Sequence, residues 1–447
     1  MKKNIIIMIA FLAIGSAVKG QTLSLTLEEA LRIANENNRS LKTQRLEQDL
    51  SREKIKESSG KFRPSISANT GYSYFFDRQV VFMPGSFVGE NQQPVVDIAV
   101  GGRNAFGASM GLHQPIISTT LKNQLNSSRI SHTIQETVTA DIESDLKIEV
   151  SSIYNKLLYN DAVIKVYNQS LEYNNKALND SKMLLKQGKS LVIDTLQNYI
   201  RVENVKTHLS YLHSQHHVLM LQLSNSLGLD DDFDIILLDS LTLSNIPVYQ
   251  FTEDEDIFFR ALESRTDIRL HQLYVELNKS NVMEAQSRRL PTLAAVAEYS
   301  VQMQADDLIN DSYSWPKTSF VGLQLNMPVF LGNRVNSQVK QSKILLEQSQ
   351  IQLENSKENA KTEVALILSK LNDAIKRLNL NEKIVQSASK SYEIVSNRYS
   401  LGLSSRLELT DAELSLNQAK LNSLQAVFDI KTTNLELDRA IGNLTIN

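Results

Sequence analysis

Two long stretches of the chain have helical periodicity and contain no proline. Proline is absent between Ile116 and Ile246 and from Val329 to the end of the chain. Within residues 118–187, apolar side chains recur at spacings of three, four and seven, which is typical of coiled coils. They are Ile134, Val138, Ile142, Leu146, Val150, Ile153, Leu157, Ile164, Leu171, Leu178 and Leu185. One helix over this stretch would be ~105 Å long.

Single glycines interrupt these stretches at the positions where turns are expected. Gly188 and Gly402 each follow a long periodic segment and precede another one. Glycine commonly ends a helix because it adopts the left-handed conformation without strain. The sequence therefore predicts two antiparallel helical hairpins, with tips near residues 188 and 402.

Four shorter runs alternate with the period of a β-strand. We predict strands over residues 65–76, 105–115, 292–303 and 317–328. One face of each run is apolar or aromatic, and the other is mostly small and polar. The apolar faces include Ile66, Ala68, Tyr72, Tyr74, Phe106, Met110, Leu112, Leu293, Ala297, Tyr299, Val321, Leu323 and Leu325. Each run is about as long as the 9 to 11 residues with which a tilted strand crosses a bilayer.

The number of strands limits how such a sheet could lie in a membrane. Four strands cannot close a barrel, and an open edge in lipid would leave amide groups unpaired. Strands in a bilayer would therefore require an oligomer. Three chains supply twelve strands, an even number within the known range, whereas two supply only eight, too few for a channel. A small soluble sheet packed on the helices is the alternative.

The chain also contains an internal repeat. A shift of 227 residues aligns the first part of two copies, and a shift of 213 or 214 aligns the remainder. The aligned pairs include Ala34 with Ala261, Glu36 with Glu263, Pro64 with Pro291, Pro115 with Pro328, Gly188 with Gly402 and Gly228 with Gly442. We assign the copies to residues 21–245 and 246–447. Each is expected to contain a helix, two strands joined by a loop, and a helical hairpin.

The loops differ in length between the two copies. The first copy has about 14 additional residues between Tyr72 and Leu112, and insertions of this kind belong in exposed loops. We expect residues 77–104 to form an extracellular loop, and residues 304–316 to form its shorter counterpart.

Residues 1–20 have the composition of a cleaved secretory signal. An apolar run from Ile5 to Ile14 follows two lysines, and a small-residue stretch then places Val18 and Gly20 at the −3 and −1 positions of a cleavage site. After this segment, no stretch approaches the roughly 18 consecutive apolar residues of a membrane-spanning helix. We therefore expect an exported protein that is not a helical membrane protein.

Charge and cysteine content exclude several classes of function. The formal charge of the 447-residue chain is −3, and removing the three lysines of the signal gives −6. This balance does not favour nucleic acid as a partner. The absence of cysteine excludes disulfide frameworks, thiolate catalysis, thiolate zinc sites and a lipidated N-terminal cysteine.

Three motifs occur in a fixed order, and two of them occur twice. They are the opening segment Leu25 to Ala34 with Asn37 and Asn38, the tips 186–194 and 398–408, and the ends Ser226-Leu227-Gly228 and Ala440-Ile441-Gly442. Together they resemble the TolC-type outer membrane efflux proteins, and the resemblance covers almost all of the mature chain.

This resemblance implies a homotrimer with a twelve-stranded barrel in the outer membrane of a Gram-negative bacterium. A long α-helical tunnel would continue the barrel across the periplasm. It also implies an exit duct for drugs, toxic compounds or metals that is driven by its partners. The implied partners are a periplasmic membrane-fusion adaptor, an inner-membrane pump of the RND, ABC or MFS type, and outer membrane lipid. Type I protein secretion is the alternative within the family.

The resemblance also assigns a pore gate. Glu408 and Asp411 match the acidic residues that ring the narrow periplasmic end in this family. They lie three residues apart and hence share one helix face. In a trimer they would form two rings of three carboxylates, which attract cations and repel anions. An ordinary solvated helix face is the alternative.

Other residues near the tips match family positions that make contacts between hairpins or dock the adaptor. The full set is Gly188, Ser190, Asp194, Tyr399, Gly402, Ser404 and Arg406. Asp194 and Tyr399 match residues that tie the hairpins together in the closed state. Ser404 replaces the basic residue that the family has there, and Arg406 follows half a turn later.

Two further groups of residues have alternative interpretations. Four of the seven histidines are His208, His213, His216 and His217. His213 and His217 share a helix face that could bind a divalent metal, but no carboxylate completes the ligand set, and a wet helix surface is the favoured interpretation. The aromatic residues at strand ends are expected at a membrane interface or in loop packing. They are Tyr72, Tyr74, Phe75, Phe76, Tyr313 and Trp315.

No motif in the sequence indicates an enzyme or a cofactor. The chain has no nucleophile-base pairing, glycine-rich phosphate loop or metalloprotease motif. The hypothesis from another functional class is a non-channel protein, either a periplasmic coiled-coil scaffold or an adhesin stalk.

Overall fold

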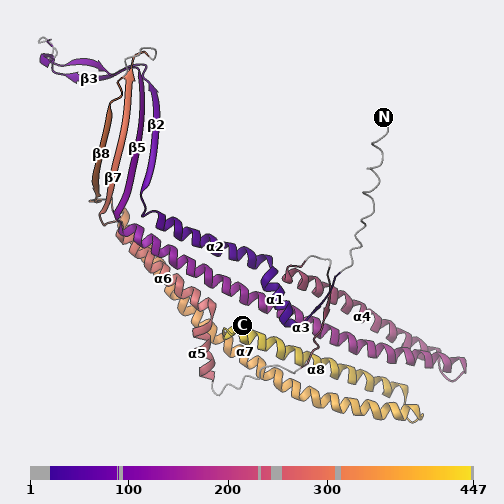
Figure 1. Cartoon of the computed structure of the whole chain (residues 1–447). Coiled ribbons are helices and arrows are strands. Elements are labelled where there is room, and N and C mark those ends of the chain that lie inside the picture. Colours follow the sequence, from indigo (N-terminus) through magenta and orange to yellow (C-terminus); the bar gives the residue numbers. More distant parts are fainter. Residues whose placement is uncertain are drawn as a thin grey trace, which may run out of the picture. The chain divides into compact units, whose positions relative to one another are not determined.

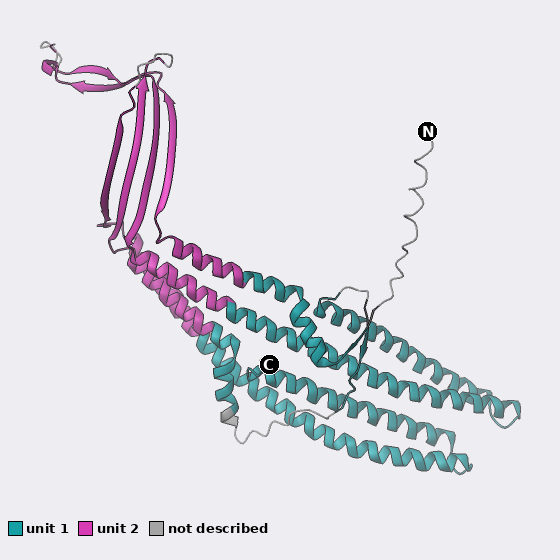
Figure 2. Cartoon of the chain, viewed as in Figure 1, with its two compact units in different colours: residues 1–47, 136–270, 353–447 teal, residues 48–135, 271–352 magenta. Residues whose placement is uncertain are grey.

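The structure, a computed structural model, divides the chain into two compact units (Figure 2). The first unit comprises residues 1–47, 136–270 and 353–447, and the second comprises residues 48–135 and 271–352. The described residues are 21–87, 89, 94–229, 233–242, 254–307 and 314–443. The predicted signal, residues 1–20, lies outside them.

The tips of two helical hairpins belong to the first unit. One hairpin consists of α3 (Thr119–Lys186) and α4 (Val192–Leu227), and the other of α7 (Arg334–Ser400) and α8 (Arg406–Ala440) (Figure 1). α3 contains 68 residues and α7 contains 67, so both are much longer than an ordinary globular helix. Within the described residues, no helix is both long and apolar enough to cross a membrane.

Two shorter helices precede the strands in each half of the chain. They are α1 (Leu27–Asn37), α2 (Arg39–Gly60), α5 (Asp254–Ser264) and α6 (Thr266–Ser287). A capping box begins α1: the Glu29 amide donates to Thr26 Oγ1 (3.3 Å), and the Thr26 amide donates to the Glu29 carboxylate (3.0 Å). A single non-helical residue, Asn38, separates α1 from α2.

The four long strands form one antiparallel sheet in the second unit. They are β2 (Ser65–Tyr74), β5 (Asn104–Ile117), β7 (Thr292–Ala305) and β8 (Lys317–Asn326), and their order is β2-β5-β7-β8. β2 and β8 end two residues before the predicted positions. β8 stops short of Pro328, which has no amide hydrogen to donate to a neighbouring strand. The outer edges of β2 and β8 have no partner strand among the described residues.

The pairing register places the four apolar faces on the same side of the sheet. Ile66 is paired with Leu112, Leu112 with Ala297, and Ala297 with Val321. Directly paired residues of antiparallel strands project from the same side. Large exposed side chains on this face are Ile66, Tyr72, Tyr74, Met110, Tyr299, Val321, Leu323 and Leu325. The single chain therefore exposes a continuous apolar surface.

Residues 77–104, which we expect to form an extracellular loop, contain a β-hairpin. β3 (Gln79–Met83) pairs antiparallel with β4 (Val96–Val100), and a short 3₁₀ helix, η1 (Gly85–Phe87), follows β3. Both strands are rich in valine and other apolar residues, which favour strands. Asp306 holds the base of this hairpin, because it pairs with Arg78 and accepts a hydrogen bond from the Arg103 amide (3.2 Å).

The first unit also contains a small two-stranded sheet that the sequence pattern did not predict. β1 (Gln21–Leu25) pairs in parallel with β6 (Phe233–Leu237). The hydroxyl of Tyr154, a fully buried residue of α3, donates to the Leu25 carbonyl (3.0 Å) or to Asp239 Oδ2 (2.7 Å). Burial raises the pKa of this hydroxyl, and the hydrogen bond with Asp239 raises it further. Tyr154 thus anchors the end of β1 to α3.

Buried side chains of the first unit form two clusters at corresponding positions. The first includes Ala34, Val150, Ile153, Leu157 and Leu223, and the second includes Ala261, Val364, Ile367, Leu371 and Leu437. Each residue of the second group is the counterpart of one in the first under the shifts of 227 and 214. Similar interior contacts therefore recur in the two halves of the chain.

Two glycines permit a close backbone approach at the ends of α4 and α8. Gly228 and Gly442 have φ angles of +69° and +68°. A Cβ atom at Gly228 would lie 2.5 Å from the Asn37 carbonyl oxygen, and one at Gly442 would lie 2.6 Å from the Ser264 carbonyl oxygen. Both positions thus require glycine for space as well as for backbone conformation.

Candidate pore gate and hairpin contacts

The two hairpin tips have the same turn geometry. Gly188 and Gly402 adopt left-handed conformations with φ angles of +71° and +72°. The Gly188 amide donates to the Leu185 carbonyl (3.0 Å), and the next amide donates to the Leu184 carbonyl (2.9 Å). The matching distances around Gly402 are 3.0 and 2.8 Å. No other atom lies within 4 Å of a Cβ built at either glycine, so only the backbone conformation favours glycine there.

Carboxylates at equivalent positions cap the helix that follows each tip. Asp194 accepts hydrogen bonds from the Ser190 hydroxyl (2.8 Å) and from the Leu191 amide (3.1 Å). Glu408 accepts hydrogen bonds from the Ser404 hydroxyl and from the Ser405 amide (3.1 Å). These bonds lower the pKa of the exposed Glu408 carboxyl below its ordinary value. Asp194 and Glu408 thus stabilise the starts of α4 and α8.

Asp411 differs from Glu408 in its surroundings. Its side chain is exposed and lies three residues further along α8, so both carboxylates occupy one face of that helix. Glu408 makes the capping contacts of the tip, and Asp411 lies beyond the capped turn. The two predicted gate residues therefore share a helix face, and Glu408 has a local structural role in addition.

Arg406 and Tyr399 contact each other within the second hairpin. The guanidinium carbon of Arg406 lies 5.5 Å from the centre of the Tyr399 ring, which is a cation–π distance. Within the described residues, no hydrogen bond joins Asp194 to Tyr399, the positions at which the family resemblance implies a tie between hairpins in the closed state. Inside this chain, the tie between hairpins lies further from the tips.

Glu413, which sequence reasoning missed, forms this tie. It projects from α8, is only 7% exposed, and accepts hydrogen bonds from Asn174 (3.0 Å) and Ser170 (3.3 Å) of α3. Burial raises the pKa of its carboxyl above the ordinary value, while these bonds and the nearby Arg406 and Arg201 oppose that shift. One sequence signal could have identified Glu413, because this carboxylate falls within the apolar stripe of α8 that continues through Leu416 and Ala419.

A second polar contact and a cavity accompany Glu413. Arg201 Nη1 of α4 donates to Thr410 Oγ1 of α8 (2.8 Å). Both residues line a cavity of about 290 Å³ between α3, α4 and α8. Other side chains that line it are Tyr167, Ser170, Asn174, His208, Glu413, Asn417 and Gln418. The two hairpins therefore meet through buried hydrogen bonds as well as apolar contacts.

The histidine cluster does not form a metal site within the described residues. His208 stacks on Tyr167 with ring centres 5.5 Å apart, and His216 lies 3.1 Å from a carboxylate oxygen of Asp161. His213 and His217 are exposed.

Of the aromatic residues at the ends of the second pair of strands, Trp315 is half exposed, and Tyr313 lies outside the described residues.

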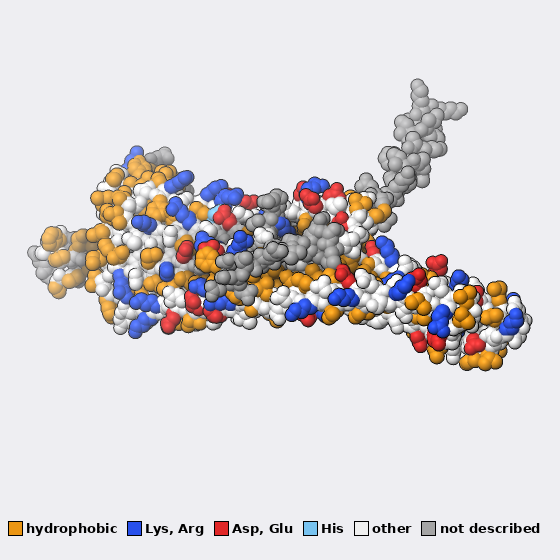
Figure 3. Space-filling model, turned by 90° about the horizontal axis from the view of Figure 1, so that it is seen from below, with side chains coloured by type: hydrophobic (Ala, Val, Ile, Leu, Met, Phe, Trp, Pro, Cys, Tyr) orange, Lys and Arg blue, Asp and Glu red, His pale blue; other side chains and the backbone are white. Residues whose placement is uncertain are grey.

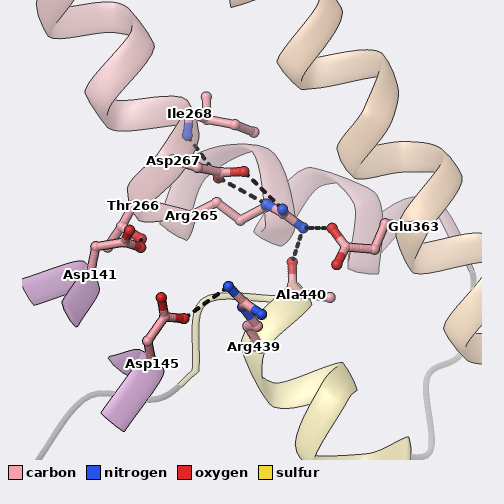
Figure 4. A network of polar contacts seen from close by, with 9 residues as sticks. All are labelled: Asp141, Asp145, Arg265, Thr266, Asp267, Ile268, Glu363, Arg439 and Ala440. Carbon is pink, nitrogen blue, oxygen red and sulfur yellow. Dashed lines mark hydrogen bonds and ion pairs between the residues drawn. The ribbon is translucent and has the colours of Figure 1, made fainter. Parts of the chain in front are cut away.

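A polar network joins α3 to the helices of the second half of the chain (Figure 4). Arg265, between α5 and α6, binds Asp267 through Nε (3.0 Å) and Nη2 (2.8 Å), and its Nη1 binds Glu363 of α7 (2.7 Å). Asp145 of α3 pairs with Arg439 of α8 (2.8 Å).

The face in Figure 3 shows lysine, arginine and acidic side chains interspersed over the helices, so charge on this face is balanced locally.

The model of the outer membrane efflux protein family matches residues 30–229 and 259–443, which is most of the chain. The chain belongs to this family. Membership places it in the outer membrane of a Gram-negative bacterium. The two matched segments lie within residues 21–245 and 246–447, respectively.

Curated relatives are distant in sequence. The chain is 27% identical to the outer membrane protein TolC of Escherichia coli over 188 residues, which cover 39% of this chain and 37% of that protein. It is 22% identical to the probable efflux pump outer membrane protein TtgC of Pseudomonas putida over 93% of this chain and 82% of that protein. The chain thus spans less than half the length of the first of these relatives.

Solved structures share the fold over nearly the whole chain. The outer membrane protein VceC of Vibrio cholerae superposes with a TM-score of 0.74 at 15% identity, over 93% of this chain and 96% of that chain. The open MtrE outer membrane channel of Neisseria gonorrhoeae superposes with a TM-score of 0.72 at 16% identity, over 96% and 93%. At 15% and 16% sequence identity, these similarities show a shared fold and nothing more specific.

Proposed function

We propose that this family member is the outer membrane exit duct of a tripartite efflux pump, and that it exports small molecules. The observation that carries the proposal is the four-stranded sheet, which has one apolar face and, among the described residues, two edges without a partner strand. An apolar face suits lipid, whereas unpaired edges in lipid cost several kcal/mol for each amide group. The sheet therefore needs further strands of the same kind beside it.

A homotrimer supplies those strands. Because all pairings in the sheet are antiparallel and the strands number four, β2 and β8 run in opposite directions. β8 of one chain can then pair antiparallel with β2 of the next. Three chains close a twelve-stranded barrel with the apolar faces outside, and the long hairpins of three chains continue it as a tunnel.

We also propose that the two halves of the chain are structural repeats. The corresponding positions of the two buried clusters support this, as do the matched glycine contacts of Gly228 and Gly442. With two hairpins from each chain, a trimer brings six hairpins around one axis. Their tips then meet at the periplasmic end.

The gate at that end consists of Glu408 and Asp411 together with the tip residues around Gly188 and Gly402. Asp411 is the principal pore charge, because the Glu408 carboxylate already accepts hydrogen bonds from its own turn. The exposed apolar side chains beside the tips are the docking surface for a periplasmic adaptor, which recruits an inner-membrane pump. They include Leu191, Val192, Leu401, Leu403 and Leu407.

Planar bilayer recordings test this function. The purified protein should produce single-channel currents, which a coiled-coil scaffold does not. Asp411→Asn and Glu408→Gln should lower cation selectivity and weaken block by a trivalent cation added on the hairpin side, because multivalent ions bind several carboxylates at once. Glu382→Gln, which removes the same charge from an exposed position on α7, is the control. Absence of channels, or unchanged selectivity in both gate variants, would contradict the proposal.

A further inference from the structure

The polar face of the sheet carries a single acidic side chain. The residues on this side include Ser65, Ser67, Asn69, Ser109, Gly111, His113, Glu298, Ser300, Gln302, Thr318, Phe320 and Gln324. Glu298 of β7 is exposed, and it is the one residue of β2, β5, β7 and β8 on this face that is charged at neutral pH. Lys317 lies in a row with Val301 on the other side.

On the adjacent strands, Glu298 has a glycine on one side and an aromatic residue on the other. The register pairs Glu298 with Gly111 of β5 and with Phe320 of β8. Gly111 has no side chain, and a Cβ built there would meet only the Ser67 hydroxyl, at 3.6 Å. Phe320 is 51% exposed and is the sole aromatic residue on the polar face of these strands. The Glu298 carboxylate therefore lies between a glycine and an exposed aromatic ring.

We propose that Glu298 determines charge selectivity in the strand-lined part of the pore, and that Phe320 adds a preference for organic cations. The proposal rests on the proposed function, since the polar face lines the pore only if the apolar face meets lipid. Directly paired residues have Cβ atoms about 4.5–5.5 Å apart, so one cation can contact both the carboxylate and the ring. Cations bearing apolar groups match this pair best.

The trimer repeats this pair three times around the pore. No second charge on the same face offsets the three carboxylates, and the remaining side chains there are small or neutral. The electrostatic potential of the three carboxylates extends far along the pore at low salt, whereas at 0.1 M salt it is screened within about 10 Å. The structure therefore provides a second cation-selective element, separate from the acidic residues at the hairpin tips.

Reversal potentials across planar bilayers in a salt gradient test the role of Glu298. Glu298→Gln should lower the cation-to-anion permeability ratio about two-fold at 0.1 M salt and more at lower salt. Glu298→Asp should keep the parent ratio. Glu298→Gln combined with Ser300→Glu, which restores a carboxylate one row along the same face, should recover it. An unchanged ratio in Glu298→Gln, or no recovery in the double variant, would overturn the proposal.

Block by tetraphenylphosphonium, added on the barrel side, tests the role of Phe320. Phe320→Leu should raise the concentration needed for half block several-fold while the permeability ratio for small ions stays unchanged. Asp411→Asn should leave this block unchanged. Equal block of the parent and Phe320→Leu would overturn the aromatic role. A parent protein that forms no channel would instead reject the proposed function, so the two failures are distinguishable.

Discussion

One buried carboxylate contributes to the contact between the hairpins. Glu413 accepts hydrogen bonds from Ser170 and Asn174, and burial raises the pKa of its carboxyl. A raised pKa means that folding favours the protonated form. Stability from this residue is therefore greatest below about pH 4.5, the ordinary pKa of glutamic acid, and falls as the pH rises through the higher folded pKa. The charged groups that face it are Arg201 and Arg406.

Substitution of Glu413 should separate the effect of charge from that of hydrogen bonding. Glu413→Gln keeps an acceptor oxygen without the buried charge, so it should equal or exceed the parent in stability at pH 7 and lose the part of the pH dependence above pH 4.5 that Glu413 contributes. Glu413→Leu removes an acceptor of the Ser170 hydroxyl and of the Asn174 amide, which still donates to the Ser170 carbonyl, and should cost about 1–3 kcal/mol. Thermal unfolding at pH 5 and pH 8 measures both effects. A Gln variant with the parent's pH dependence would contradict the assignment.

Among the elements, the glycines that end the helices fall into two groups. Gly188 and Gly228 share a left-handed backbone, but only Gly228 lies against another segment, the Asn37 carbonyl. Gly188→Ala should therefore cost about 1 kcal/mol from backbone strain alone. Gly228→Ala adds a clash with backbone and should cost more, about 2–4 kcal/mol. Unfolding temperatures of the two variants compare them directly, and equal losses would show that the close approach is unimportant.

The same elements show what the sequence can predict and what it cannot. The limits of α3 and the existence of the four long strands follow from periodicity, because each pattern extends over many residues. β3 and β4 contain only five residues each, and the parallel pairing of β1 with β6 joins segments about 200 residues apart, so periodicity could not find them. Glu413 escaped notice because its burial depends on the packing of α8 against α3.

For the whole molecule, the central question is whether the sheet closes with copies of itself. The chain has no cysteine, so introduced thiols can report strand neighbours without ambiguity. Disulfides form only when Cα atoms lie within about 7 Å. Thr318→Cys on β8, combined with cysteine at Ser65, Ser67, Asn69 or Ser73 on β2, scans one face of both edges.

Closure predicts a specific pattern of cross-links. One or two of the β2 positions should form disulfides with residue 318 of the next chain, and the products on a non-reducing gel should end at the covalent trimer, because a closed ring leaves no free edge. Thr318→Cys combined with Ser109→Cys on β5 is the control, since β5 is already paired on both sides within its own chain. Monomers at every position would contradict closure between chains, and a ladder beyond three chains would indicate open association of edges in place of a barrel.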